Sequence, residues 1–216
     1  MSQGSRRSGS NLLIDSMLRR NKKRHNRKKI YIIEHLEPKL WKWCLIEYEH
    51  ISKIVGKKYL WFGNIKNRKD AECLGKYGKV ITKSIKQLNL KNACVLDPEA
   101  KKTLNPKEAK SFDYFIFGGI LGDYPPKKRT QKELSKFLKN CEKRNIGKEQ
   151  MSTDNAVFCV KKIVDGKNLR KMKFADKIEI KINAFESVVL PYRYNVVKKK
   201  PLISKKLVDY IKIKGI

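Results

Sequence analysis

The feature that most constrains the fold of this chain is an unbroken run of four large apolar residues at 114–117 (YFIF), followed directly by two glycines. A strand with one face in water alternates apolar and polar side chains, whereas a short continuous apolar run indicates a strand buried on both faces. Similar runs occur at 31–33, 59–62 and 93–96. Because segments with helical spacing lie between them, we predict an α/β fold with a mostly parallel sheet and helices on both faces.

Apolar residues at three- and four-residue spacing predict the main helices. The first is expected to open at Pro38, where a missing N–H is harmless, and the second to cover 153–165. A last amphipathic helix is expected to begin at Ser204, a good N-cap. Thr130 and Glu133 match a capping box, so a further helix is expected to begin with Thr130 as its cap.

Basic residues outnumber acidic ones, with 52 Lys and Arg against 21 Asp and Glu and a formal net charge of +31. The first 30 residues hold ten Lys or Arg and one acid, so we predict a basic disordered tail at 1–29 and one folded domain at 30–216. Most of the excess charge lies in the folded part. Such a charge attracts polyanions, which favours RNA or a ribonucleoprotein as a partner. A lysine-rich composition that merely solvates the surface is the alternative.

Several classes of protein are disfavoured. No apolar run approaches the ~20 residues that span a bilayer, so no membrane partner is expected. The start of the chain is polar and lacks the apolar core of a signal peptide. We therefore expect an intracellular protein without a disulfide frame or a metal site, because the cysteines are odd in number and scattered: Cys44, Cys73, Cys94, Cys141 and Cys159.

Three segments are candidates for a ligand site, because ligands of open α/β sheets bind beyond the carboxyl ends of the strands. They are 97–99 (DPE), 117–126 (FGGILGDYPP) and 147–156 (GKEQMSTDNA). In the second, three glycines would let the backbone approach a flat ligand, and Ile120 and Leu121 offer apolar surface. The glycine spacing matches neither a dinucleotide fingerprint nor a Walker motif. On the pattern alone, an ordinary strand-ending turn is the simpler interpretation.

Five segments taken together and in order resemble the eukaryotic SPOUT-class family of protein arginine methyltransferases. They are YIIEHLE (31–37), CVLDP (94–98), FDYFIFGGILGDYPPKKRT (112–130), GKEQMSTDNA (147–156) and LPYRY (190–194), and the glycine block is the most specific of them. The resemblance covers roughly residues 30–196. It implies a trefoil-knotted α/β fold, an exception to the rule that chains do not thread loops.

The resemblance also implies S-adenosylmethionine as the cofactor, held by three loops. The expected cofactor residues are Leu96, Asp97 and Pro98 in the first loop, Gly118, Gly119, Ile120, Leu121, Gly122 and Asp123 in the second, and Gln150, Met151, Ser152, Thr153 and Ala156 in the third.

An arginine acceptor needs carboxylates, because a guanidinium with a pKa of about 12.5 or more has its lone pair tied up. A carboxylate can orient the planar group through two hydrogen bonds and accept a proton. Each candidate also has a structural interpretation, as a capping acid, a loop-fixing acid or a salt-bridge partner. The predicted catalytic residues are Glu34 with His35 as first choice, then Asp123 and Arg193, with Glu37 and Asp154 as further acids.

The leading hypothesis is transfer of a methyl group to an arginine of a small-subunit ribosomal protein, with contacts to ribosomal RNA. A SPOUT-class methyltransferase of ribosomal or transfer RNA is the second hypothesis, and it fits the basic charge directly. A non-catalytic RNA-binding ribosome-assembly factor is the third. The resemblance implies a monomer in the cytoplasm, while the basic run at 19–29 makes the nucleus an alternative.

Overall fold

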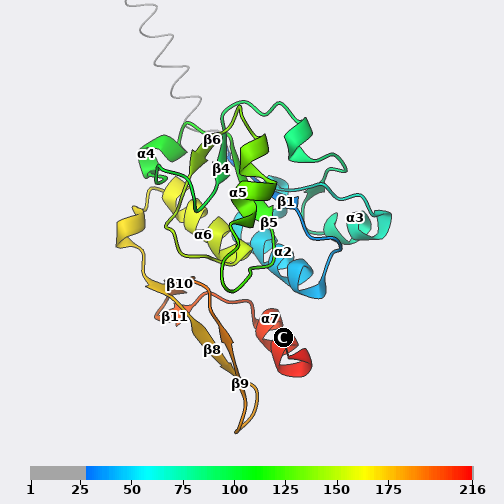
Figure 1. Ribbon diagram of the computed structural model, residues 1–216, viewed down its shortest axis with the longest axis vertical. Coiled ribbons are helices and arrows are strands. Elements are labelled where there is room, and N and C mark those ends of the chain that lie inside the picture. Colours follow the sequence, from blue (N-terminus) through cyan, green and yellow to red (C-terminus); the bar gives the residue numbers. More distant parts are fainter. Residues whose placement is uncertain (1–27, 216) are drawn as a thin grey trace, which may run out of the picture.

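A parallel sheet of six strands forms the centre of the computed structural model, which describes residues 28–215 (Figure 1). Every pairing between neighbouring strands of this sheet is parallel, as the apolar runs predicted. From one edge to the other the strands are β3 (Lys79–Val80), β2 (Leu60–Gly63), β1 (Ile30–His35), β5 (Tyr114–Gly119), β4 (Ala93–Leu96) and β6 (Glu142–Arg144).

Helices cover both faces of the sheet, which confirms the predicted layer architecture. Side chains alternate along each strand, so Ile33 and Ile32 of β1 enter two different apolar clusters. The cluster of Ile33 contains α2 (Lys42–Val55) and α6 (Thr153–Val164). The cluster of Ile32 is covered by short elements, namely α5 (Arg129–Glu133) with the 3₁₀ turns η2 (Ile85–Gln87) and η3 (Ser135–Phe137). Two smaller helices, α3 (Arg68–Leu74) and α4 (Pro106–Ala109), complete the layers.

Two predicted helix starts are wrong. The chain beyond β1 stays extended for one more residue, since the Leu36 N–H donates to the Gly119 carbonyl (3.1 Å), and α2 begins only at Lys42 instead of Pro38. In α5 the N-cap is Lys128 rather than Thr130. The predicted capping box does not form, because the Glu133 carboxylate pairs with Arg129 at 2.7 Å instead of reaching back to the helix start.

The C-terminal part of the chain packs on the outer side of α2 (Figure 1). A hairpin of β8 (Ile178–Lys181) and β9 (Ser187–Leu190) and the helix α7 (Lys205–Lys214) share an apolar cluster with Ile46. A second small antiparallel sheet joins β7 (Phe174–Ala175), β10 (Tyr194–Val197) and β11 (Lys200–Pro201). No helix within residues 28–215 has the length and apolar character to cross a membrane.

The predicted disordered tail lies outside the described residues, except at its end. Lys29 was placed in the tail, yet it belongs to the fold, because its Nζ donates to the carbonyl oxygens of Lys110 (2.8 Å) and Phe112 (2.5 Å). The trefoil knot implied by the family resemblance stays a prediction.

Candidate active site

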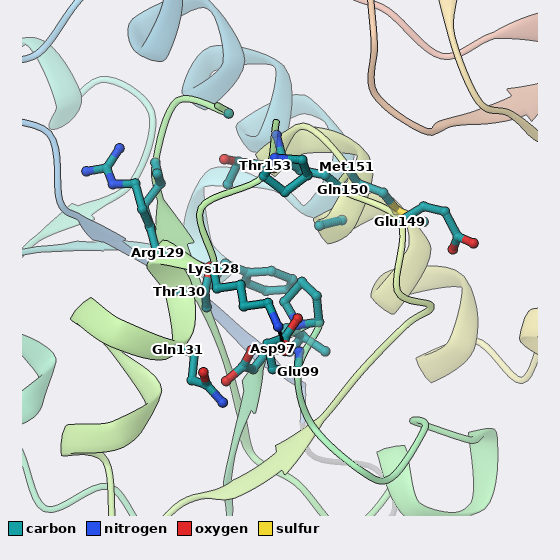
Figure 2. Close-up of a pocket in the computed structure, with 18 of the residues that line it drawn as sticks. Asp97, Glu99, Lys128, Arg129, Thr130, Gln131, Glu149, Gln150, Met151 and Thr153 are labelled. Atoms are coloured by element: carbon teal, nitrogen blue, oxygen red, sulfur yellow. Dashed lines mark hydrogen bonds and ion pairs between the residues drawn. The ribbon is translucent and has the colours of Figure 1, made fainter. Parts of the chain in front are cut away.

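A cavity opens at the carboxyl ends of β4 and β5, beside the N-terminus of α6 (Figure 2). Figure 2 shows Asp97 and Glu99 on one side of it and Gln150, Met151 and Thr153 on the other. The structure therefore brings together the three segments that the strand-end argument selected. The cavity is lined by 96–99, 117–118, 120–123, 126–131 and 146–151, together with Thr153 and Ala156.

Most of the residues predicted to bind the cofactor line this cavity. Gly119 and Ser152 do not. For the others the placement agrees with the prediction, while contact with a cofactor stays a prediction; they are Leu96, Asp97, Pro98, Gly118, Ile120, Leu121, Gly122, Asp123, Gln150, Met151, Thr153 and Ala156.

The two adjacent glycines of the second loop serve different purposes. A Cβ atom added to Gly118 would lie 2.9 Å from Ile120 Cδ1, which belongs to the cavity wall. A Cβ atom added to Gly119 would lie 2.2 Å from Tyr48 Oη and 2.8 Å from Ile33 Cγ2. Gly119 is therefore needed for packing of α2 on the sheet, whereas Gly118 faces the cavity.

A carboxylate beyond β1 holds the glycine loop in place. Glu37 Oε1 accepts a hydrogen bond from the Leu121 N–H (3.0 Å) and another from Arg129 Nη1 (2.8 Å). Arg129 also donates to Glu133, and these two carboxylates raise the pKa of the guanidinium above its ordinary value, Glu133 most strongly. Glu37 thus joins the start and the end of the loop that surrounds the cavity.

The first loop is fixed by its own aspartate. Asp97 is buried, and its carboxylate accepts hydrogen bonds from the Ser135 hydroxyl and from the Glu99 N–H, the latter at 2.9 Å. The Asp97 N–H in turn donates to the Arg144 carbonyl (2.9 Å), which continues the pairing of β4 with β6. Both oxygens of Asp97 are therefore engaged in shaping the wall of the cavity.

The LPYRY segment is hydrogen-bonded to the second and third loops. The Tyr192 hydroxyl donates to the Gly122 carbonyl (2.9 Å), and the Arg193 N–H donates to the Gln150 carbonyl (2.8 Å). The guanidinium of Arg193 forms ion pairs with Asp176 (2.6 Å) and Glu149 (2.7 Å). The salt-bridge interpretation of Arg193 fits this geometry, because the side chain supports the cavity from outside.

The structure does not bring Glu34 and His35 to the cavity. Glu34 is fully buried, and its carboxylate accepts hydrogen bonds from the Ser84 hydroxyl and the Ile85 N–H. His35 Nδ1 bonds to Tyr48 Oη at 2.9 Å. Burial raises the pKa of Glu34 and lowers the pKa of His35, so both neutral forms are favoured. Their geometry supports a role in packing and gives no support to the predicted catalytic role.

Asp123 is the one of the four predicted catalytic residues that lines the cavity. Its carboxylate is partly exposed and pairs with Lys127 at 2.9 Å. Within residues 28–215, no group of three or more His, Cys, Asp or Glu side chains is arranged to hold a metal ion. The cavity is lined by acidic side chains such as Asp123 and Glu149, by basic side chains such as Lys127 and Arg129, and by apolar side chains.

A buried pair of carboxyl groups behind the cavity was not predicted as a pair. Glu47 of α2 and Asp154 of α6 are both buried, and Trp43 Nε1 donates to Glu47 (2.9 Å) while His50 Nδ1 lies 2.7 Å from Asp154. Burial, with the nearby Asp154 charge second, raises the pKa of Glu47 to about 8, although hydrogen bonds from Trp43 and then Thr153 oppose this shift. The signal was present in the sequence, since residue 47 lies on the apolar face of the predicted helix.

The sheet order, the glycine loop after β5 and the cavity at the strand ends correspond to the fold of the SPOUT class. The structure of Trm10 from Thermococcus kodakaraensis has this fold, with a TM-score of 0.50 and 20% identity over 65% of this chain and 95% of that chain. At this identity the likeness establishes the fold alone.

More similar relatives establish the family. A family profile described as "Protein arginine N-methyltransferase SFM1-like" matches residues 30–215. Protein arginine N-methyltransferase SFM1 of Saccharomyces cerevisiae is 36% identical over 199 residues, which cover 84% of this chain and 93% of the yeast protein. The crystal structure of yeast SFM1 complexed with SAM superimposes with a TM-score of 0.80, 34% identity and coverage of 87% and 91%. The chain therefore belongs to the SFM1-like family of protein arginine N-methyltransferases.

Replacement of the two glycines should destabilise the protein to different extents. Gly119→Ala should lower the free energy of unfolding by about 1–3 kcal/mol, because the new methyl group overlaps Tyr48 and Ile33. Gly118→Ala should cost less, since the atom that it meets is the end of the flexible Ile120 side chain. Urea unfolding of both variants measures the difference, and an equal loss in both would contradict the assignment.

The raised pKa of Glu47 leads to a pH-dependent expectation. Below the ordinary value of 4.5 the group is neutral in both states, and between 4.5 and about 8 the unfolded state ionises first, so stability falls as pH rises. Glu47→Gln should remove this loss. The free energy of unfolding of the variant, relative to that of wild type, should therefore be roughly 1–3 kcal/mol higher at pH 8 than at pH 5, since one pKa unit corresponds to ~1.4 kcal/mol.

Glu49 of the same helix provides the control for that measurement. Hydrogen bonds from Lys206 and Lys53 lower the pKa of Glu49 to about 2, so its contribution is already present at pH 5 and persists at pH 8. Glu49→Gln should therefore differ from wild type by a similar amount at both pH values. Urea unfolding at the two pH values tests both variants, and parallel pH profiles for wild type and Glu47→Gln would refute the expectation.

Proposed function

We propose that the cavity binds S-adenosylmethionine and that the protein methylates an arginine of a small-subunit ribosomal protein. The observation that carries the proposal is the convergence of the three strand-end loops on one cavity, in a chain that aligns with SAM-bound yeast SFM1 over most of its length. The proposal includes a trefoil-knotted, monomeric enzyme that acts in the cytoplasm, as the family resemblance implies.

The residues of the cavity fit an adenosyl group. Leu96, Ile120 and Leu121 offer apolar surface for the faces of an adenine ring. Gly118 leaves open the space that a Cβ atom would fill beside Ile120, so the backbone can approach a flat ligand.

S-adenosylmethionine supplies an electrophilic methyl group, so the task of the protein is to position the acceptor nitrogen and remove its proton. Holding the reacting atoms close and in line can contribute about 7–11 kcal/mol to lowering the barrier. The methylated guanidinium keeps its positive charge after one proton leaves, and a nearby carboxylate is needed to accept that proton.

Asp123 is our candidate for this carboxylate. It lines the cavity on the glycine loop, and its present partner Lys127 has an exposed side chain, so a substrate guanidinium can take the place of the ammonium group. Glu149, which also lines the cavity, is half exposed and already pairs with Arg193.

The proposed activity can be tested with methyl-labelled S-adenosylmethionine and small ribosomal subunits. We expect the label in the protein fraction, on arginine after acid hydrolysis, and none in the ribosomal RNA. Label in the RNA would instead establish an RNA methyltransferase. Label in neither fraction, with subunits lacking prior methylation, would favour a non-catalytic assembly factor.

The role of Asp123 can be tested separately. Asp123→Asn should lower kcat by roughly 10²–10⁴-fold, the usual contribution of a positioned acid or base, and change the dissociation constant of S-adenosylmethionine by a much smaller factor. Single-turnover kinetics and calorimetric titration measure the two quantities. Full turnover by this variant would exclude Asp123 as the proton acceptor, and Lys127→Gln serves as the control for loss of the ion pair.

A further inference from the structure

A lysine-lined groove adjoins the candidate active site. It lies between the first loop, the segment of α5 and η3, and strand β6, and its volume of about 610 Å³ falls in the range of ligand-sized sites. Asp97, Glu99 and Gln131 line both this groove and the cavity, so the two share a wall. A molecule bound in the groove would therefore lie next to the proposed site of methyl transfer.

The charge of this groove is unbalanced. Within residues 28–215 its exposed lysines form no ion pair, whereas its acids are engaged. Glu99 pairs with Lys128 at 2.7 Å, and Glu142 pairs with Arg144 at 2.9 Å. The lysines whose ammonium groups remain available are Lys101, Lys102, Lys132, Lys136 and Lys143.

An exposed aromatic ring continues the same surface. Phe137 is 52% exposed, and the Nζ atoms of Lys86 and Lys136 lie 4.7 Å and 4.8 Å from its ring centroid. Phe137 borders a second hollow that also contains Lys139, and Cys141 lines this hollow as well as the groove. The ring and the lysine groove therefore form one continuous surface.

We propose that this surface, the lysine groove with Phe137, binds single-stranded RNA beside the methyl-transfer cavity. Lysines along a groove match the regularly spaced phosphates of a nucleic-acid strand, and an exposed ring offers a platform on which an unpaired base can stack. An acidic peptide would satisfy the charges but leave the ring without a planar partner. The choice of RNA rests on the proposed function, because a ribosomal substrate presents RNA around its proteins.

The test compares two triple variants of the full chain that remove equal charge. The groove variant carries Lys102→Glu, Lys136→Glu and Lys143→Glu. The control carries Lys177→Glu, Lys181→Glu and Lys212→Glu, which lie on the exposed surface near the hairpin and α7. Fluorescence anisotropy measures the affinity of each for a labelled 12-nucleotide single-stranded RNA at several salt concentrations.

We expect the groove variant to bind RNA at least tenfold more weakly than the control. Its salt dependence should be shallower by about two in the slope of log K against log salt, because about 0.7 of a counterion is released per single-strand phosphate contact. Equal affinities and slopes for the two variants would overturn the proposal. If wild type bound a labelled poly-glutamate peptide as tightly as it binds the RNA, the proposal would also be overturned, because the site would then recognise charge alone.

The aromatic contact has its own control. Phe137→Ala should weaken RNA binding by about five- to hundredfold, the range measured for loss of base stacking, whereas Phe185→Ala on the fully exposed hairpin tip should not.

A methyl-transfer assay separates this inference from the proposed function. If wild type labels neither free ribosomal protein nor subunits, the proposed function is wrong. If the groove and control variants have equal KM on intact subunits, only the proposed RNA site is contradicted.

Discussion

Parallel pairing of β5 with its two neighbours is the constraint on which the rest of the structure depends. Because all three strands run in the same direction, their carboxyl ends meet at one edge of the sheet, where the loops that follow can share a cavity. The register places Gly118 opposite Glu34 and Gly119 opposite His35, so β5 turns into the glycine loop where β1 ends. Glu37 then fixes that loop through its hydrogen bonds from the Leu121 N–H and from Arg129.

The remote C-terminal part of the chain supports the loops that form this cavity. Tyr192 and Arg193 bond to the backbone of the second and third loops, and buried Asn195 donates from its N–H to Asn155 Oδ1 at 2.8 Å. These contacts join α6, the glycine loop and β10 into one hydrogen-bonded unit. Glu47 of α2 and Asp154 of α6 are both buried, so the packing of the two helices brings two carboxyl groups near each other.

Several elements could be predicted because their causes are local. Unbroken apolar runs indicate strands buried on both faces, and glycines at a strand end indicate a close backbone approach. Strand β6 could not be predicted in this way, since Glu142 and Lys143 are exposed and the strand exists only through its pairing with β4. The lysine groove was likewise hidden, because its residues come from two separate regions of the sequence, 97–102 and 131–144.

The sequence by itself determined the class of fold, the three loops and, through their motifs, the family to which the chain belongs. Only the tertiary structure decided which side chains reach the cavity. Successive residues of a strand point to opposite faces, so Glu34 turns to the face of Ile85 and His35 to Tyr48 on α2, and both faces are covered. A carboxylate at a strand end is therefore recognisable in the sequence, but its direction depends on the packing of distant elements against the sheet.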